Sequence, residues 1–494
     1  MTPPADEKKP PLEAGKELED RASVEHGSST EFSAEAERKL VRKIDLMILP
    51  IMLVAYMMSF MDKQTLSYAA IMGIMEDLRL TGAEYSWSSA IFYFGYLAFS
   101  YPASLLMVRF PLGKYLACTY IVWAIVLACH AATTNFTGLM VARFFLGCTE
   151  ASVSPGFSLL TSLWYRTAEQ PLRHGIWFCG NSLSLIIGGA IAVGIWQIET
   201  SLATWKWLYI IFGLVTFTWG VVMLFRLPDS PTNATFLTPE ERVIAIARLK
   251  SNRAGYKTNQ IDKSQMVEAF TDPKTWFLGV LILGCNIPNG GYTTFSGLIL
   301  KGFGYNTLNT LLLGIPGGFI SFLVVLASCY ASSKIPNSRC TVSIILSCSS
   351  ILGTALVYAT HHNASRYVGL ILMSFYAVTM PLSMALISAN VGGVTKRSTV
   401  SAIYFILYCA GNIIGPQLFF EWQAPVYQSG FVAIFVCLAV VVVVLGGLVV
   451  YLRGENARRD RVMGGTESGE QEGEGDDELM DVTDLKNERF RYVY

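Results

Sequence analysis

The stretch RFFLGCTEASVSPG, residues 143–156, places an arginine and a glutamate inside a long apolar run. An ionised side chain at the centre of a bilayer costs about 2.5–3.5 kcal/mol even on mild insertion scales, so neither Arg143 nor Glu150 can face lipid. Steps of three and four residues from Arg143 reach Gly147, Glu150 and Ser154, which predicts one polar stripe along a helix. We expect this helix to turn its stripe toward a partner helix or a water-filled route.

The composition around this stretch indicates a polytopic membrane protein. The 494 residues are 52% hydrophobic and 15% charged, whereas a soluble domain carries about 25% charged residues. Apolar runs of roughly 20 residues recur along the chain, and each is long enough to cross a hydrocarbon core about 30 Å thick. The formal net charge is zero. We expect the chain to lie in the lipid bilayer and not to bind nucleic acid.

Twelve transmembrane spans are expected from these apolar runs. Their predicted limits are 44–64, 85–107, 114–132, 136–162, 173–197, 205–226, 275–300, 307–331, 339–360, 366–390, 398–421 and 429–452. The longest internal polar stretch separates the sixth span from the seventh. It contains LTPEERVIAIARLKS, in which Thr238 is expected to cap a short amphipathic helix.

The predicted fold class is therefore an all-α membrane protein with two six-helix bundles. The N-terminal bundle covers residues 44–226 and the C-terminal bundle covers 275–452, with a cytoplasmic linker at 227–274. Residues 1–43 and the acidic residues 453–494 are predicted to be disordered cytoplasmic tails, because neither contains an apolar segment.

Lysine and arginine predict the orientation of the spans. With a cytoplasmic N-terminus, the five cytoplasmic loops hold sixteen of these residues and the six outer loops hold five. Both termini are therefore expected in the cytoplasm. The sequons at Asn135 and Asn363 fall in short outer loops and are candidate glycosylation sites.

The first span carries a second pair of charges, Asp62 and Lys63, in the motif SFMDKQT. If the helix ends soon after them, they are interfacial charges; if it continues through LSYAAIMGIM, they lie deep in the bundle. Both possibilities remain open from the sequence. A buried carboxylate is suited to exchanging protons, and a buried arginine is suited to binding a carboxylate.

The C-terminal half carries neutral polar stripes in its seventh and eleventh spans. Such residues serve either to pack helices together or to hydrogen-bond a substrate. The candidate substrate-lining residues are Asn286, Asn289, Tyr292, Tyr404, Tyr408 and Asn412.

No enzymatic chemistry is indicated. The five histidines are scattered, and no nucleophile elbow, phosphate loop or metal-ligand spacing is present. The ten cysteines lie almost entirely in apolar runs and are interpreted as small core residues. We therefore expect no cofactor and no metal.

RFFLGCTEASVSPG, after SFMDK, resembles the anion:cation symporter family of the major facilitator superfamily. WKWLYIIFG, LPDSP, NIPNGG, KGFGYNTLNTLLLGIPGG, GNIIGPQLF and the terminal FRYVY resemble its fungal allantoate permease-like group, whose substrates include allantoate, nicotinate, pantothenate and biotin. The resemblance runs from about Arg42 to the C-terminus. It implies the major facilitator fold, in which a substrate site lies between two bundles that rock against each other.

The resemblance also implies roles for particular residues. Asp62 and Glu150 match positions that bind protons in the family, and Arg143 matches the arginine that meets the substrate anion. Lys63 stands where many relatives have arginine, so it keeps the charge but loses the bidentate geometry.

The functional hypothesis is proton-coupled symport of a small organic anion, by a monomer in the plasma membrane. Protonation of Glu150 and Asp62 would permit the loaded carrier to reorient, with Arg143 and Lys63 binding the anion. The alternative is a proton-coupled exporter of a drug or secondary metabolite. The fifth span, GNSLSLIIGGAIAVGIW, argues against it because it has no proline, whereas drug antiporters of the superfamily commonly carry a Gly-Pro signature there.

Overall fold

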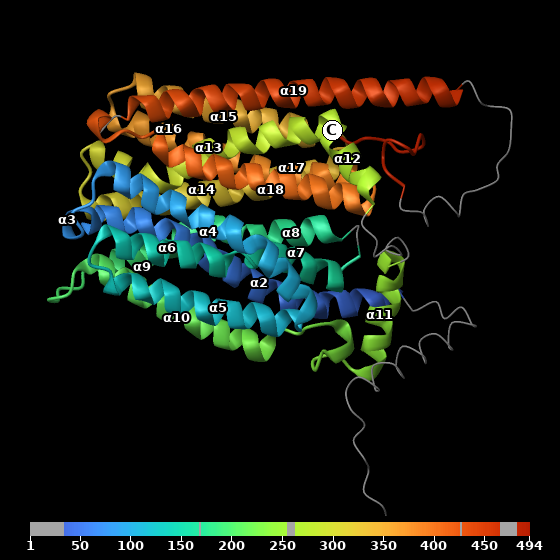
Figure 1. The fold of residues 1–494 in the computed structure, drawn as a ribbon, viewed down its shortest axis with the longest axis horizontal. Coiled ribbons are helices and arrows are strands. Elements are labelled where there is room, and N and C mark those ends of the chain that lie inside the picture. Colours follow the sequence, from blue (N-terminus) through green and yellow to red (C-terminus); the bar gives the residue numbers. More distant parts are fainter. Residues whose placement is uncertain (1–33, 167–168, 254–261, 425–426, 465–481) are drawn as a thin grey trace, which may run out of the picture.

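The computed structural model describes residues 34–166, 169–253, 262–424, 427–464 and 482–494. Within these ranges the regular secondary structure is helical, with no strand. The helices lie side by side in two groups, one from each half of the chain (Figure 1).

The N-terminal bundle consists of α2 (Ala34–Ile71), α3 (Ile74–Asp77), α4 (Gly82–Arg109), α5 (Leu112–Cys129), η2 (His130–Ala132), α6 (Phe136–Glu150), α7 (Val153–Trp164), α8 (Gln170–Phe178), α9 (Gly180–Trp196) and α10 (Thr204–Arg226). The linker holds η3 (Pro231–Asn233), α11 (Pro239–Arg253) and α12 (Lys263–Thr271). The C-terminal bundle consists of α13 (Pro273–Gly302), α14 (Thr307–Lys334), α15 (Arg339–Ala359), α16 (Asn363–Met373), η4 (Ser374–Val378), α17 (Thr379–Asn390), α18 (Val394–Gln417), η5 (Glu421–Gln423) and α19 (Gln428–Gly464).

Helices cover all twelve predicted spans. Ten helical stretches of the described chain are long and apolar enough to cross a membrane. The other two predicted spans correspond to α13 and to α6 with α7. The fold is thus the all-α, two-bundle membrane architecture expected from the sequence.

The two ends of the molecule differ. Helices α11 and α12 and the C-terminal residues 482–494 lie at one end, here called the linker end, and α3 lies at the opposite, far end (Figure 1). The predicted cap of α11 is confirmed, because Glu241 N donates to Thr238 Oγ1 at 3.2 Å and Thr238 N donates to Glu241 Oε2 at 2.9 Å. Lys43 on α2 contacts the same carboxylate at 2.6 Å, so the linker is anchored on the N-terminal bundle.

Both predicted tails are shorter in the structure than in the sequence prediction. α2 begins at Ala34, so residues 34–43 are helical and Leu40 is buried. α19 continues to Gly464, past the predicted boundary at 453. The remainder of the two tails, residues 1–33 and 465–481, lies outside the described residues.

The C-terminal segment, residues 482–494, packs against the linker end of the C-terminal bundle. Asp484 is fully buried and accepts from Lys274 on α13 and, at 2.8 Å, from Lys396 on α18. Arg459 on α19 donates to the backbone of Asp484 at 2.9 Å and to the Tyr492 hydroxyl at 2.8 Å. Charges that are far apart in sequence therefore neutralise one another here. The composition of the tail does not reveal these partners, so it predicted disorder.

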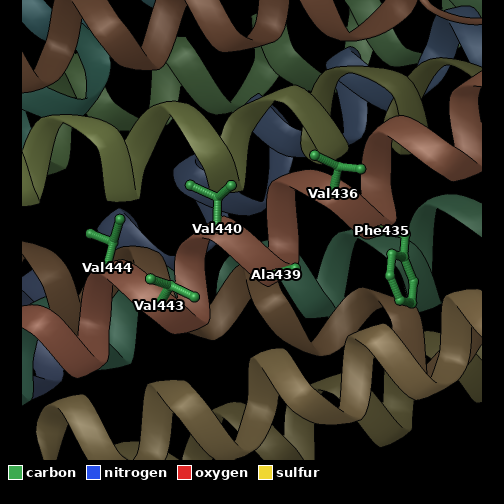
Figure 2. A pocket seen from close by; sticks show the side chains of 6 residues that line it. All are labelled: Phe435, Val436, Ala439, Val440, Val443 and Val444. Atoms are coloured by element: carbon green, nitrogen blue, oxygen red, sulfur yellow. The ribbon is translucent and has the colours of Figure 1, made fainter.

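The outer face of α19 is apolar over several turns. Phe435, Val436, Ala439, Val440, Val443 and Val444 line a shallow groove on this face (Figure 2). Val443 is 73% exposed. An exposed stripe of this composition is suited to contact with lipid chains.

Candidate functional site

Asp62 and Lys63 lie within a continuous helix. α2 extends to Ile71, so Asp62 precedes its far-end terminus by nine residues, or about 13 Å at 1.5 Å per residue. Its carboxylate is 0% exposed. The sequence left open whether Asp62 and Lys63 lie at the membrane interface or deep in the bundle, and the structure places them deep in the bundle.

Lys63 and Glu150 form an ion pair between α2 and α6. Ser59, one turn before Lys63, donates its hydroxyl to the same carboxylate and lies 3.3 Å from Lys63 Nζ. The Glu150 side chain is 1% exposed, whereas that of Lys63 is 19% exposed. The anion of the pair is thus enclosed in the bundle, and the cation is its more accessible partner.

Arg143 lies deeper than Lys63 and does not contact Glu150, as expected for side chains about 10 Å apart along one helix axis. Its Nε donates to the Ser88 carbonyl at 3.0 Å, and the residue is 3% exposed. The Phe92 ring lies 5.5 Å from the Arg143 guanidinium and 5.7 Å from Lys63 Nζ, so both cations pack on the same aromatic side chain.

The helix of the fourth span is broken into two segments, but Ala151 and Ser152 between them keep right-handed helical dihedral angles. α6 ends at Glu150 and α7 begins at Val153. Pro155 lacks the amide proton that would bond the Ala151 carbonyl, which explains a break one turn before the proline. Gly147 allows α4 and α6 to pack closely and is not part of a polar surface, because a Cβ there would lie 1.9 Å from the Phe92 carbonyl oxygen on α4.

Three of the predicted substrate-lining residues bond one another. Asn412 on α18 donates to Asn286 on α13 at 2.9 Å and accepts from Asn289 at 2.8 Å. Asn286 and Asn412 are buried, and Asn289 is half-buried. The sequence left helix packing and substrate binding open for these polar residues, and the contacts between them are typical of helix packing. Asn289 is the most exposed of the three.

The three predicted tyrosines have separate surroundings. Tyr404 is buried and its hydroxyl lies 2.6 Å from that of Ser383. The Tyr408 ring lies 6.1 Å from Tyr93 on α4, so it spans the boundary between the bundles. Tyr292 is half-buried and lies within electrostatic range of Tyr68 on α2. Tyr408 and Tyr292, not Tyr404, thus face the opposite bundle.

Sequence reasoning missed several polar residues around Glu150. Ser59 is one, and its spacing of four residues from Lys63 was a usable signal. Tyr56 on α2 and Tyr96 on α4 both lie beside Ser154 and within electrostatic range of Glu150. These tyrosines lie within apolar runs of the sequence, where an aromatic residue indicates packing and gives no signal of a polar site.

The two bundles are joined by hydrogen bonds in their far-end halves. The Tyr85 hydroxyl donates to the Thr294 carbonyl at 2.7 Å, and Ser89 lies 2.7 Å from the Thr294 hydroxyl. Ser86 donates to the Pro416 carbonyl at 3.0 Å. Near the linker end, Tyr101 on α4 and Ser401 on α18 are exposed. This conformation is therefore closed at the far end.

The structure also places the remaining predicted features. Asn135 and Asn363 are exposed at the far end, and Asn135 Oδ1 accepts from Gly138 N at 2.8 Å as the cap of α6. Among the described residues, no group of three or more His, Cys, Asp or Glu side chains has the geometry of a metal site.

Comparison with known proteins defines the class. The sequence profile of the Major Facilitator Superfamily matches residues 52–416. The chain belongs to this superfamily of membrane transporters.

Individual relatives agree with this assignment. The chain is 40% identical over 466 residues to an uncharacterized transporter of Schizosaccharomyces pombe, covering 94% of this chain and 91% of the relative. It is 36% identical over 484 residues to the allantoate permease of Saccharomyces cerevisiae, covering 95% and 89%. Since these relatives are transporters, the chain is a transporter and not an enzyme.

Solved structures confirm the fold. A bacterial homolog of the human lysosomal transporter Spinster, in an inward-facing and occupied conformation, superposes with a TM-score of 0.56 at 14% identity. The match covers 80% of this chain and 93% of that one. At this identity the likeness concerns the fold alone.

Proposed function

We propose that this transporter couples protons to the symport of a small organic anion, by way of the Lys63–Glu150 ion pair. Glu150 and a substrate carboxylate compete for the same cation. A proton on Glu150 removes the competitor and leaves Lys63 available to the anion. Proton and anion then favour each other's binding, which is the thermodynamic requirement for symport.

The charge balance of the site supports this coupling. Asp62 and Glu150 offset Lys63 and Arg143, so the four residues sum to zero when all are ionised. An anion entering the neutral site would add an uncompensated charge to a low-dielectric region, which is unfavourable. One proton on Asp62 or Glu150 restores neutrality. Arg143, being deeper, supplies a fixed positive field while Lys63 meets the anion.

The substrate class is a carboxylate such as a ureide or a carboxylate vitamin. The similarity to an allantoate permease supports a ureide carboxylate as the first compound to test. Tyr408, Tyr292 and Asn289 lie on the opposite bundle and are proposed to hydrogen-bond the neutral part of the substrate. Asn286, Tyr404 and Asn412 are proposed to hold this surface in place.

The cellular setting follows from the same proposal. We propose a monomer in the plasma membrane with both termini in the cytoplasm, so the linker end faces the cytoplasm. The far end, with Asn135 and Asn363 as candidate glycosylation sites, then faces outward. Treatment of the expressed protein with an N-glycosidase tests this orientation, because a mobility shift requires the sequons to have crossed the membrane.

Uptake by proteoliposomes tests the coupling. Radiolabelled allantoate, nicotinate, pantothenate and biotin are offered under an inward proton gradient, with a pH dye inside. Symport predicts substrate-dependent acidification of the interior. Glu150→Gln should abolish accumulation driven by the gradient while retaining exchange of internal for external substrate. Proton flux opposite to substrate flux would identify an exporter, and full driven uptake by Glu150→Gln would exclude the assigned coupling.

A further inference from the structure

The interior of the N-terminal bundle contains three further polar side chains, Tyr120, His130 and Tyr209, in addition to Asp62 and Arg143 of the proposed anion site. Asp62, Tyr120, His130, Arg143 and Tyr209, here called the N-bundle polar cluster, come from α2, α5, η2, α6 and α10. All five are 0–3% exposed. Apolar side chains are the usual occupants of such positions, so five polar groups together require an explanation.

Most of their polar atoms lack a hydrogen-bond partner among the described residues. These atoms are both carboxylate oxygens of Asp62, the hydroxyls of Tyr120 and Tyr209, His130 Nε2 and Arg143 Nη1. Trp123 Nε1 and Thr216 Oγ1, on α5 and α10, are buried and unpartnered as well. Buried polar groups in folded proteins are almost always hydrogen-bonded, to protein or to ordered water.

The unpartnered polar atoms of the cluster are near one another without bonding directly. Tyr209 lies within electrostatic range of both Asp62 and Arg143, and His130 lies within range of Arg143. Tyr120 lies within range of Asp62 and Glu150. Polar atoms that face one another beyond direct hydrogen-bond distance are commonly bridged by water.

The cluster extends toward the far end of the bundle. His130 stacks on Tyr209 with ring centroids 4.9 Å apart, and Tyr209 packs edge-on against Trp205. Trp205 Nε1 donates at 2.9 Å to Asp77, which is exposed. One aromatic layer thus separates the cluster from the far-end surface.

We propose that the N-bundle polar cluster holds ordered water that conducts protons between the far end and Asp62. This proposal rests on the proposed function, and it gives the proton a route within one bundle, separate from the route of the anion between the bundles. At each hop one O–H bond breaks and another forms. The Tyr209 hydroxyl therefore regains a proton as it gives one, and Asp62 ends protonated. Asp62 lies within electrostatic range of Lys63 on its own helix and of Arg143 and Glu150 on α6, so these charges influence its uptake of the proton.

Hydroxyl-radical footprinting tests for the water without any substrate. Buried side chains that touch ordered water are oxidised by X-ray-generated radicals, whereas dry ones are protected. In phosphatidylcholine nanodiscs, Tyr209 and Trp123 should be oxidised at least fivefold faster than Phe212, after correction for intrinsic reactivity. Phe212 is fully buried on the same helix as Tyr209, one turn away. Equal, low rates at all three residues would overturn the proposal.

Infrared difference spectroscopy after a pH jump tests the proton route. Asp62→Asn identifies the carboxyl band of Asp62. Tyr209→Phe removes only a hydroxyl and should slow the appearance of this band at least tenfold. Tyr115→Phe is the matched control, because the Tyr115 hydroxyl is hydrogen-bonded to Ser152, which is not a member of the cluster. Unchanged kinetics in Tyr209→Phe would exclude the route. Symport would still stand if Glu150→Gln uncouples uptake, so the two proposals fail separately.

Discussion

Lys63 and Glu150 share one ion pair but differ in their access to solvent, since the lysine side chain is 19% exposed and the glutamate side chain 1%. The pair joins the first and fourth spans of the N-terminal bundle. The proposed substrate anion would therefore meet the lysine and not the glutamate. The proposed function requires this pair to exchange its partner, whereas a static structural pair would not.

Removing Lys63 is expected to destabilise the protein through Glu150. Lys63→Met leaves a buried carboxylate without its cation, and breaking a buried pair from one side costs about 3–5 kcal/mol. Adding Glu150→Gln should recover most of the loss, because the unpaired charge is gone. Thermal unfolding of the two single variants and the double variant in detergent measures this coupling. A double variant as unstable as the sum of the single variants would contradict the interpretation.

Gly147 is expected to tolerate no side chain. A Cβ would lie 1.9 Å from the Phe92 carbonyl oxygen and 2.9 Å from Tyr96 N, so α4 and α6 must separate. Gly147→Ala should cost about 1–3 kcal/mol or more through overpacking. Gly194→Ala is the control, since nothing lies within 4 Å of its Cβ position. Monodisperse yield and thermal midpoint should fall only for Gly147→Ala.

Asn412 is expected to couple α13 to α18. Its amide exchanges hydrogen bonds with Asn286 and Asn289 at 2.9 and 2.8 Å. Polar contacts of this kind in membranes contribute about 0.6 kcal/mol on average and up to about 1.7 kcal/mol. A double-mutant cycle of Asn412→Ala with Asn289→Ala, followed by thermal unfolding, measures the coupling. Strict additivity of the two changes would show that the bond contributes nothing.

Asp484 is expected to hold the C-terminal segment in place above pH 5. Burial opposes its ionisation, but Lys274 and Lys396 outweigh burial and hold the pKa of Asp484 below its ordinary value. A group with a lowered pKa stabilises the fold above its unfolded-state pKa, near 3.9, and loses this contribution as the pH falls through the folded value.

Carboxypeptidase digestion checks this expectation. Wild-type protein should resist digestion equally at pH 8 and pH 5. Asp484→Asn should lose its C-terminal residues at both pH values, because both lysines are left buried without this anion. Glu240→Gln is the control, because Glu240 is an exposed carboxylate on α11, in the linker. Equal resistance of the Asp484→Asn variant would show that the ionic contacts do not hold the segment.

The helical architecture could be predicted because each span is a local property of the sequence. Apolar length located the spans, and Thr238 with Glu241 located the start of α11. The sequence also contained the signal for the break between α6 and α7, in Pro155. The prediction used helical periodicity alone and therefore expected one continuous helix there. Prediction succeeded where the interaction partners lie within a few residues of each other.

The arrangement of the site could be predicted only in part. The charged fourth span was expected to face inward, and it does, whereas the depth of Asp62 and Lys63 on the first span was left open. Helix geometry excluded Arg143 as the direct partner of Glu150, but the pairing with Lys63 depends on how α2 packs against α6, which no local pattern specifies. The same holds for Asp484, whose two lysine partners lie 88 and 210 residues away. Such long-range pairing is a property of tertiary structure.

The far end carries one contact with a further consequence. Glu421, from the C-terminal bundle, accepts from Gly82 N at 2.8 Å and so caps the first turn of α4 in the N-terminal bundle. When the bundles part, the exposed helix start loses a carboxylate that belongs to the other half. Attraction between a charge and a helix dipole weakens with salt. The return of the empty carrier should therefore respond to the ionic strength of the medium at the far end, which is the external medium in the proposed orientation.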